Sequence, residues 1–161
     1  MSAKVPADTR VGHIHLKVTD LDRAVHFYSA VLGFTVTQRY GEQAAFLAAG
    51  DYHHHIGLNT WHSSGAGPAP VRAAGLYHAA FVFPDRASLG AALQRVLDHG
   101  TNLDGAADHG VSEAVYFNDP DGNGIELYRD RAPEDWPRNA DGTLKMVNAP
   151  LAVDALLAEA R

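Results

Sequence analysis

Three side chains in the sequence are suited to hold a divalent metal ion. His13 and His78 each occupy the third position of a strand-like run, residues 11–18 and 76–83. Glu126 falls in the middle of a third such run, where a carboxylate would otherwise face a core. Two neutral imidazoles and one carboxylate leave coordination positions open, which is the arrangement of non-haem iron(II) oxygenases. We therefore predict a metal site made of His13, His78 and Glu126.

The offset between the two histidines indicates a duplicated unit. His78 follows His13 by 65 residues, and Asp85 follows Asp20 by the same number. Each aspartate stands where a helix would begin, as an N-cap residue. This shared offset predicts two βαβββ modules, neither of which could bury its sheet alone. Pairing of two such modules around a pseudo-twofold axis would bring both imidazoles to one point. The sequence is compatible with pairing inside one chain and with exchange between two chains.

The first module is predicted over residues 11–61. Its opening strand places His13 and His15 on one face. An apolar stripe at helical spacing follows Asp20 and ends at Gly33, a residue typical of helix ends. Three further strands are predicted at residues 34–40, 43–48 and 52–61.

The second module is predicted over residues 76–129, after a loop rich in Gly, Pro and Ser. Its first strand contains His78, and its helix begins at Asp85 and ends at Gly100. Its remaining strands are predicted near residues 101–103, 111–118 and 124–129.

The whole chain is expected to form a single domain, residues 1–161, of the α+β class. The two modules should form a curved mixed sheet around a central metal cleft. A polar tail at residues 130–161 follows them, with a short helix at 151–160.

The segment before Glu126 supports the metal assignment. Asp119-Pro-Asp-Gly-Asn-Gly carries the residues of a tight turn, so the next strand would present Glu126 at a fixed place. A lone strand histidine is more often a core or surface residue, and Glu126 alone would suit an exposed edge strand. The repeated offset together with the carboxylate after this turn favours the metal site over those readings.

Composition excludes several classes of protein. The apolar fraction of 46% and charged fraction of 20% are those of a globular protein. A formal charge of −6 gives no basic surface for nucleic acid or for an anionic membrane. The absence of cysteine excludes disulfides and thiolate ligands. Residues 1–10 lack the apolar run of a secretory signal, so a cytoplasmic location is expected.

Taken together, three segments resemble the vicinal oxygen chelate superfamily. They are Gly12-His13 through Gly33-Phe34, Leu76-Tyr77-His78, and residues 119–128. That superfamily contains extradiol ring-cleaving dioxygenases, glyoxalase I, and fosfomycin and bleomycin resistance proteins. The resemblance covers roughly residues 10–145, including the tail motif Tyr128-Arg-Asp-Arg131 with Trp136. It is strongest to the catechol 2,3-dioxygenase-like proteins.

The resemblance also discriminates between branches. Glyoxalase I uses a fourth ligand, a Glu in the last strand of the first module, and Gly57 stands at that position here. Glycine has no ligand atom, so the four-ligand isomerase site is not built. The bleomycin-resistance type lacks the metal residues and sequesters its ligand in an apolar cleft, which fits poorly with the three retained ligands.

In the extradiol branch, the resemblance implies three further catalytic residues. A histidine in the last strand of the first module acts as the acid–base group, which corresponds to His54, with His55 as the competitor. His109, which precedes a Gly, and Tyr116, ten residues before Glu126, complete the set. The other readings are an adventitious metal-binding surface for residues 53–55 and core packing for Tyr116.

These residues predict an iron(II)-dependent extradiol dioxygenase, with manganese(II) as the alternative metal. A catechol-like substrate and O₂ would bind together, and a histidine would accept and return a substrate proton. The alternatives are another metal-dependent lyase or isomerase, glyoxalase-like, and a module that sequesters a small molecule. Exposed sheet edges predict a homodimer, with Trp136 of the tail packed on the partner or over the cleft.

Overall fold

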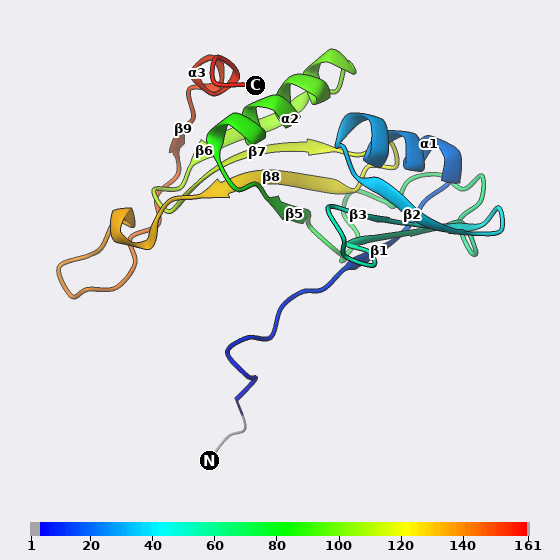
Figure 1. The fold of residues 1–161 in the computed structure, drawn as a ribbon, viewed down its shortest axis with the longest axis horizontal. Coiled ribbons are helices and arrows are strands. Elements are labelled where there is room, and N and C mark those ends of the chain that lie inside the picture. Colours follow the sequence, from blue (N-terminus) through cyan, green and yellow to red (C-terminus); the bar gives the residue numbers. More distant parts are fainter. Residues whose placement is uncertain (1–3, 161) are drawn as a thin grey trace.

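The fold is that of a computed structural model, which describes residues 4–160. Residues 1–3 and 161, which the sequence analysis included in the single domain and the tail, lie outside the described part. Two sheets lie side by side, and the two longer helical segments cover the same side of them (Figure 1). Within the described part, no helix has the length and apolar character needed to cross a membrane.

The first module forms a four-stranded mixed sheet with one helical segment. Its strands follow the order β1-β4-β3-β2, and β1 pairs in parallel with β4. The strand bounds are β1 (Ile14–Lys17), β2 (Thr35–Tyr40), β3 (Ala44–Ala48) and β4 (Ile56–Asn59). Asp20 caps helix α1 (Leu21–His26) by accepting from the backbone NH of Arg23, as predicted. The helix continues as a π-helix, η1 (Phe27–Val31), and Gly33 follows it with a φ of 89°.

The second module repeats this order in a five-stranded sheet. Its strands follow the order β5-β8-β7-β6-β9, and β5 pairs in parallel with β8. The strand bounds are β5 (Ala79–Val82), β6 (Leu103–Asp108), β7 (Ser112–Asn118), β8 (Gly124–Asp130) and β9 (Ala149–Pro150). Asp85 caps α2 (Arg86–Asp98) through the backbone NH of Ser88, again as predicted. The predicted α+β fold of two βαβββ modules is confirmed, although the strands are divided between two sheets.

The tail packs on its own chain. A 3-10 helix, η2 (Pro133–Asp135), follows β8, and the indole NH of Trp136 donates to the carbonyl of Arg131 at 2.7 Å. Strand β9 joins the edge of β6. Helix α3 (Val153–Leu157), shorter than the predicted 151–160, places the fully buried Leu156 against α2.

One buried core extends through both modules and holds them side by side. Tyr28, which is fully buried, donates its hydroxyl to Asp119 at 2.9 Å. The ring of Phe34 packs against Phe81 of the second module, with centroids 5.1 Å apart. Arg95 on α2 donates to the carbonyl of Val31 at 3.0 Å. These contacts fix the position of one module against the other within the chain.

Both predicted metal histidines stand one residue before a strand. His13 was predicted inside a strand over residues 11–18 and His78 inside one over 76–83, but β1 begins at Ile14 and β5 at Ala79. The strands are shorter because each pairs with only four residues of its parallel neighbour. The two histidines nevertheless keep equivalent places in the two modules.

Candidate metal centre and active site

His78 and Glu126 form one half of the predicted metal site. Glu126 lies on β8 opposite Ala80 of β5, and its Oε2 is 2.9 Å from Nε2 of His78. Two ligand atoms that each lie about 2.1 Å from one ion would be about 3 Å apart at a right angle. The pair therefore has the donor types and the separation that a shared metal ion requires.

Gly124 allows this approach. A Cβ on Gly124 would lie 2.2 Å from the carbonyl oxygen of Tyr77 and 3.1 Å from Cβ of His78. No larger residue fits without moving the backbone that carries His78. The glycine of the predicted turn therefore sets the separation between β5 and β8 at the site.

Tyr116 and His109 lie next to His78 and Glu126, and the four residues together are called the half-site of the second module. Tyr116 on β7 lies opposite Glu126 on β8, and its hydroxyl donates to Oε1 of Glu126 at 3.0 Å. The same hydroxyl is 2.7 Å from Nε2 of His109. Burial, followed by the charge of Glu126, raises the pKa of Tyr116 to about 12. The phenol therefore keeps its proton at neutral pH.

The hydrogen bonds around His109 define where protons can reside. Nδ1 of His109 is 3.0 Å from the carbonyl of Val147, a pure acceptor, so Nδ1 carries a proton. In a neutral ring, Nε2 then competes with Glu126 for the single hydroxyl proton of Tyr116. A proton on Nε2 removes the competition, because His109 donates to Tyr116 and Tyr116 donates to Glu126. The chain His109–Tyr116–Glu126 can thus accept one additional proton without losing a hydrogen bond.

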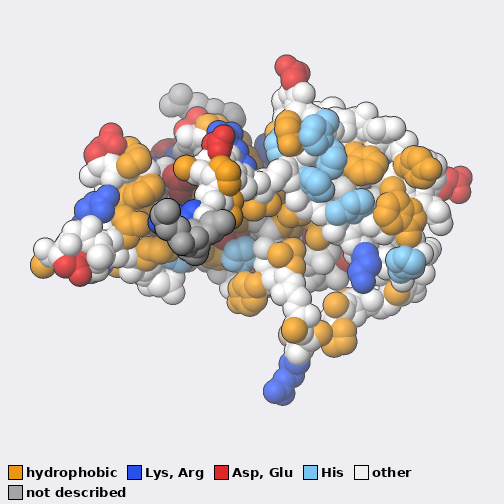
Figure 2. Space-filling view, turned by 90° about the horizontal axis from the view of Figure 1, so that it is seen from below, with side chains coloured by type: hydrophobic (Ala, Val, Ile, Leu, Met, Phe, Trp, Pro, Cys, Tyr) orange, Lys and Arg blue, Asp and Glu red, His pale blue; other side chains and the backbone are white. Residues whose placement is uncertain are grey.

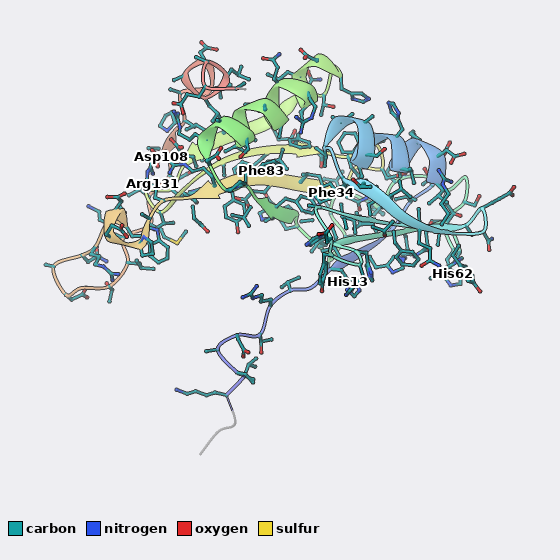
Figure 3. The ribbon with its side chains drawn as sticks, viewed as in Figure 1. His13, Phe34, His62, Phe83, Asp108 and Arg131 are labelled. Atoms are coloured by element: carbon teal, nitrogen blue, oxygen red, sulfur yellow. The ribbon has the colours of Figure 1, made fainter. Side chains whose placement is uncertain are left out.

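An ion pair holds the turn that carries His109. Asp108 accepts from the backbone NH of Gly110 at 2.8 Å and from Nη1 and Nη2 of Arg131 at 2.5 and 2.9 Å. Arg131 also donates to the carbonyl of Gly110 at 3.1 Å. The hydrogen bond from Arg131 lowers the pKa of Asp108 to about 2. Figure 3 shows Asp108 and Arg131 side by side at the end of the second module.

A cavity lies directly beside this half-site. Its volume is about 520 Å³, within the usual range for small-molecule sites. The side chains of His78, His109 and Tyr116 line it together with Tyr77 and Asn148. A single aromatic ring would fit in this space with its polar groups toward the histidines and the tyrosine.

His13 and His54 form the other half of the predicted site, on the first module. Their ring centroids are 4.5 Å apart. Nδ1 of His54 is 2.7 Å from Nδ1 of His53, so one of these two rings donates to the other. Desolvation, followed by the charge of His13, lowers the pKa of His54. A neutral His54 near pH 7 is suited to accept a proton.

The histidines at 53–55 precede strand β4, which begins at Ile56. They were predicted inside a strand over residues 52–61, and this was wrong because the chain pairs with β3 and β1 only from Ile56 onward. Nδ1 of His55 accepts from the backbone NH of Ala49 at 3.2 Å. Nδ1 of His55 is therefore occupied by this backbone hydrogen bond, whereas the ring of His54 lies next to His13.

Gly57 lies against His15 in the structure. The two residues are opposite each other in the β1–β4 pair, and a Cβ on Gly57 would lie 2.8 Å from Cγ of His15. The His15 ring itself packs between Phe46 and Trp61. A side chain at position 57 would displace His15.

The two halves of the predicted site do not meet within one chain. Among residues 4–160, no three His, Asp or Glu side chains come close enough together to hold one metal ion. The structure brings His78, Glu126, Tyr116 and His109 together, and it leaves His13 and His54 with the other module. The donor types fit a divalent metal, but a single chain supplies only two of the three predicted ligands at one place.

Sequence reasoning assigned no contacts to Asp119 and Asp121, the two carboxylates of the turn before Glu126. Asp119 organises the predicted turn by accepting from the backbone NH groups of Asp121 and Asn123, and it binds Tyr28 of the first module. Asp121 accepts from the hydroxyl of Thr19 at 2.5 Å. The Pro and Gly residues of the turn were visible in the sequence, but the partners of its carboxylates come from distant segments.

The fold is one of paired βαβββ modules, and a histidine and a carboxylate meet on the sheet of the second module. The family model described as the glyoxalase/bleomycin resistance protein/dioxygenase superfamily matches residues 10–127. The chain belongs to this superfamily, as the resemblance predicted.

Curated relatives of the chain carry dioxygenase names. Catechol-2,3-dioxygenase of Bacillus subtilis (strain 168) is 40% identical over 154 residues, which cover 95% of this chain and 53% of the relative. Biphenyl-2,3-diol 1,2-dioxygenase 3 of Rhodococcus globerulus is 31% identical over 75% of this chain and 63% of its own length. The chain thus spans between half and two thirds of these relatives.

Solved structures show the same fold. A glyoxalase/dioxygenase from Nostoc punctiforme has a TM-score of 0.64 and 22% identity, over 82% of this chain and 99% of the other. A lactoylglutathione lyase from Agrobacterium tumefaciens has a TM-score of 0.58 and 24% identity, over 78% and 96% of the two chains. At these identities the likeness establishes the fold alone.

Proposed function

We propose that the protein is an iron(II)-dependent extradiol dioxygenase that opens a catechol-like ring with O₂. The observation that carries this proposal is the connected set His78, Glu126, Tyr116 and His109 beside a cavity large enough for an aromatic ring. The similarity to catechol-2,3-dioxygenase at 40% identity supports the same class of reaction. The metal ligands remain those predicted from the sequence, His13, His78 and Glu126, with manganese(II) as the alternative ion.

Each residue has a role that follows from its contacts. Bound iron(II) would supply the coordination positions at which the substrate oxygens and O₂ meet. Tyr116, which keeps its proton, donates to oxygen atoms that carry negative charge. His109 can hold an additional proton and pass it to the Tyr116 oxygen as the tyrosine gives up its own. His54, neutral and beside His13, is the base that accepts a hydroxyl proton from the substrate.

The proposal includes a homodimer. The second module leaves β5 as an open sheet edge, and the first module leaves β1 as another. Open edges of this kind are usually covered by another chain or element. Trp136 binds its own chain through Arg131, so the tail supports the site from within the chain. The cytoplasmic location stays a prediction.

Ring cleavage can be tested directly. The protein is loaded with iron(II) without O₂, mixed with catechol, and then exposed to O₂ while O₂ uptake and the yellow ring-cleaved product are followed. The proposal expects stoichiometric O₂ uptake and product with the wild-type protein, and neither with Glu126→Gln. His62→Ala, which changes an exposed loop histidine, serves as the control and should react as the wild type does.

The same experiment separates the alternatives. Iron binding and catechol chelation without O₂ uptake would indicate a lyase or isomerase and would contradict the dioxygenase. Tight binding of an aromatic ligand by protein that takes up no metal would indicate a sequestering module.

A further inference from the structure

The cavity beside the half-site of the second module contains a further pair of polar side chains, Asp104 and Asn118, called the polar pair below. Both residues line the cavity together with Tyr116 and His109. Asn118 lies two residues after Tyr116 on β7, so the two side chains point to the same side of the sheet, whereas Phe117 between them is buried in the core. The polar pair therefore lies on the side of the sheet that the half-site occupies.

The spacing between the polar pair and the half-site suits a substituted ring. Asn118 lies opposite Gly124 on β8, and Tyr116 lies opposite Glu126. Two residues along a strand advance about 7 Å, which is about the length of an aromatic ring with one substituent. Gly105 and Gly124 place no side chain on this part of the cavity wall. A ring whose hydroxyl groups meet the half-site can thus place a substituent at the polar pair.

An irregularity in β6 brings Asp104 to this side of the sheet. The register between β6 and β7 shifts at Asp104, which lies between the paired residues Leu103 and Gly105. An extra residue of this kind re-aims its side chain. The carboxylate of Asp104 accepts a hydrogen bond from Nδ2 of Asn118, so the two side chains hold each other in place.

The hydrogen bond within the polar pair leaves two acceptors free. A carboxylate only accepts, so the amide of Asn118 turns Nδ2 toward Asp104 and leaves Oδ1 for another partner. Among residues 4–160, no donor reaches Oδ1 of Asp104 or Oδ1 of Asn118. Two free acceptors and one negative charge match a donor with a positive charge. An ammonium group is such a donor and carries three N–H bonds.

The charged side chains around the cavity are carboxylates. Among residues 4–160, no lysine or arginine lines the cavity, and its histidines are His78 and His109. Figure 2, seen from below, shows other histidine side chains gathered over the first module. Glu126 is a predicted metal ligand, so Asp104 is the carboxylate that remains for a substrate.

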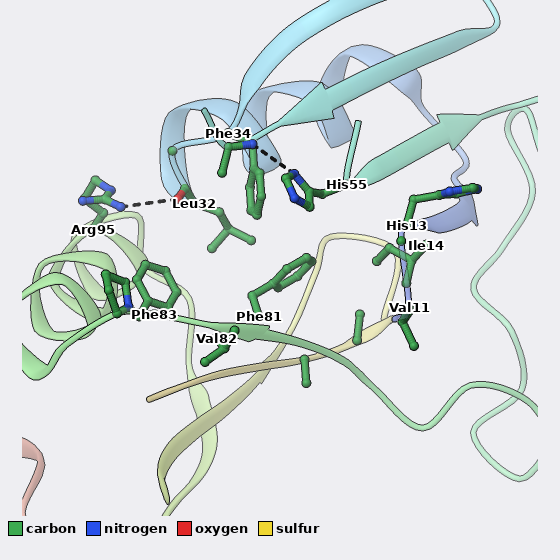
Figure 4. Close-up of a pocket in the computed structure, with 16 residues that line it drawn as sticks. Val11, His13, Ile14, Leu32, Phe34, His55, Phe81, Val82, Phe83 and Arg95 are labelled. Atoms are coloured by element: carbon green, nitrogen blue, oxygen red, sulfur yellow. Dashed lines mark hydrogen bonds between the residues drawn. The ribbon is translucent and has the colours of Figure 1, made fainter. Parts of the chain in front are cut away.

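The groove between the two modules offers no comparable group. Its volume is about 510 Å³, and apolar side chains such as Phe34, Phe81 and Val82 line most of it (Figure 4). Arg95 at one end is occupied by the carbonyls of Val31 and Leu32. A polar substituent is therefore better matched by the cavity beside the half-site.

We propose that Asp104 and Asn118 select a catechol-like substrate whose ring carries an alkylammonium group. Asp104 supplies the negative charge, and both side chains supply acceptors to the N–H bonds. A carboxylate substituent at the same place would meet the like charge of Asp104 and would be disfavoured. The inference rests on the proposed function, which places the ring hydroxyl groups at the half-site.

Two catechols that differ only in charge test the proposal. One carries an aminoethyl group at ring position 4, and the other carries a carboxymethyl group there. Calorimetry without O₂ measures the binding of each probe to the iron-loaded protein, and O₂ uptake then gives kcat/KM for each. The wild type should bind the ammonium probe at least about fivefold more tightly than the carboxylate probe, the effect of one ion pair in a solvated site.

Three variants make the test specific. Asp104→Asn keeps the shape and an acceptor for Asn118 but removes the charge, so the two affinities should become nearly equal. Asp104→Lys should reverse the preference. Asp98→Asn removes the same charge from the exposed end of α2, on the helical side of the sheets, and should keep the wild-type ratio. Equal affinities in the wild type, or a ratio that Asp104→Asn leaves unchanged, would overturn the inference.

The outcomes also separate this inference from the proposed reaction. Selective binding that depends on Asp104, without ring cleavage, would support the inference and contradict the dioxygenase. Cleavage of unsubstituted catechol with equal kcat/KM for the two probes would support the dioxygenase and overturn the inference. Failure of both probes to bind would overturn it whatever the result with unsubstituted catechol.

Discussion

Nε2 of His78, the residue before β5, lies 2.9 Å from Oε2 of Glu126 on β8. The parallel pairing of β5 with β8 creates this proximity, since it places the residue before β5 next to the carboxylate on β8. Among the three predicted ligands, these two are the ones that the structure brings together.

His54 and His55 should differ in their effect on turnover. His54→Gln should lower turnover by on the order of 10²-fold, the usual effect of losing a proton-transfer group, with iron content unchanged. His55→Gln should retain most of the turnover, because His55 binds the backbone NH of Ala49. Steady-state O₂ uptake and iron analysis measure both effects. Full activity in His54→Gln with loss in His55→Gln would transfer the acid–base role to His55.

The ion pair between Asp108 and Arg131 should position His109. Arg131→Met should reduce turnover by about tenfold while the iron content stays at the wild-type value. The turn over residues 108–110 would lose the guanidinium bonds to the Asp108 carboxylate and to the carbonyl of Gly110. Arg131→Lys should recover part of the loss. Equal iron loss and activity loss in Arg131→Met would show a structural effect instead.

Asp108 should also make stability depend on pH. Its pKa in the folded protein, about 2, is below the ordinary value of 3.8, so ionised Asp108 stabilises the fold above about pH 4. That contribution should disappear as the pH falls from about 4 to about 2. Urea unfolding of wild type and Asp108→Asn should therefore give free energies that differ at pH 6 and converge toward pH 2. A constant difference over this range would contradict the assignment.

Gly57 should tolerate a side chain only when His15 is shortened. Gly57→Ala places a methyl group within 3 Å of the His15 ring and should cost about 1–3 kcal/mol of stability, a usual range for overpacking. The double variant Gly57→Ala with His15→Ala should recover part of this cost, relative to His15→Ala alone. Additive effects in urea unfolding would show that the two residues do not meet.

Val82 should lie in the contact between chains. Val82→Glu introduces a charge on the exposed side of β5 and should weaken the dimer at least about tenfold, as expected for a charge buried without a partner. Val36→Glu on β2, at the outer edge of the first sheet and 37% exposed, is the matched control. Sedimentation of both variants over a range of concentrations measures the effect. Equal dissociation of the two variants would argue against this face.

The module pattern was predictable from the sequence because its signals are local. Asp20 and Asp85 cap their helices as expected, and the apolar stripe of the first helix, including Leu21 and Tyr28, is buried. Tyr116 lies opposite Glu126 because a short turn fixes the register of β7 and β8, and this turn could be read from the sequence.

The relative placement of the modules was not predictable in the same way. It depends on contacts between distant segments, such as Tyr28 with Asp119 and Arg95 with Val31, for which neither residue type nor spacing gives a signal. The ion pair of Asp108 with Arg131 was not predictable either. The resemblance marked the motif that contains Arg131, but it did not indicate that Asp108 is its partner. An equal offset of two histidines shows that they are equivalent, but it does not determine which chain supplies each one.

The proposed metal centre holds one iron ion between His13, His78 and Glu126. Anomalous diffraction at the iron absorption edge, from crystals of the iron-loaded protein, locates the ion most directly. One strong peak per chain is expected, roughly 2.0–2.3 Å from the ligand atoms of all three residues. A peak at the histidines of residues 53–55, with none beside Glu126, would contradict it.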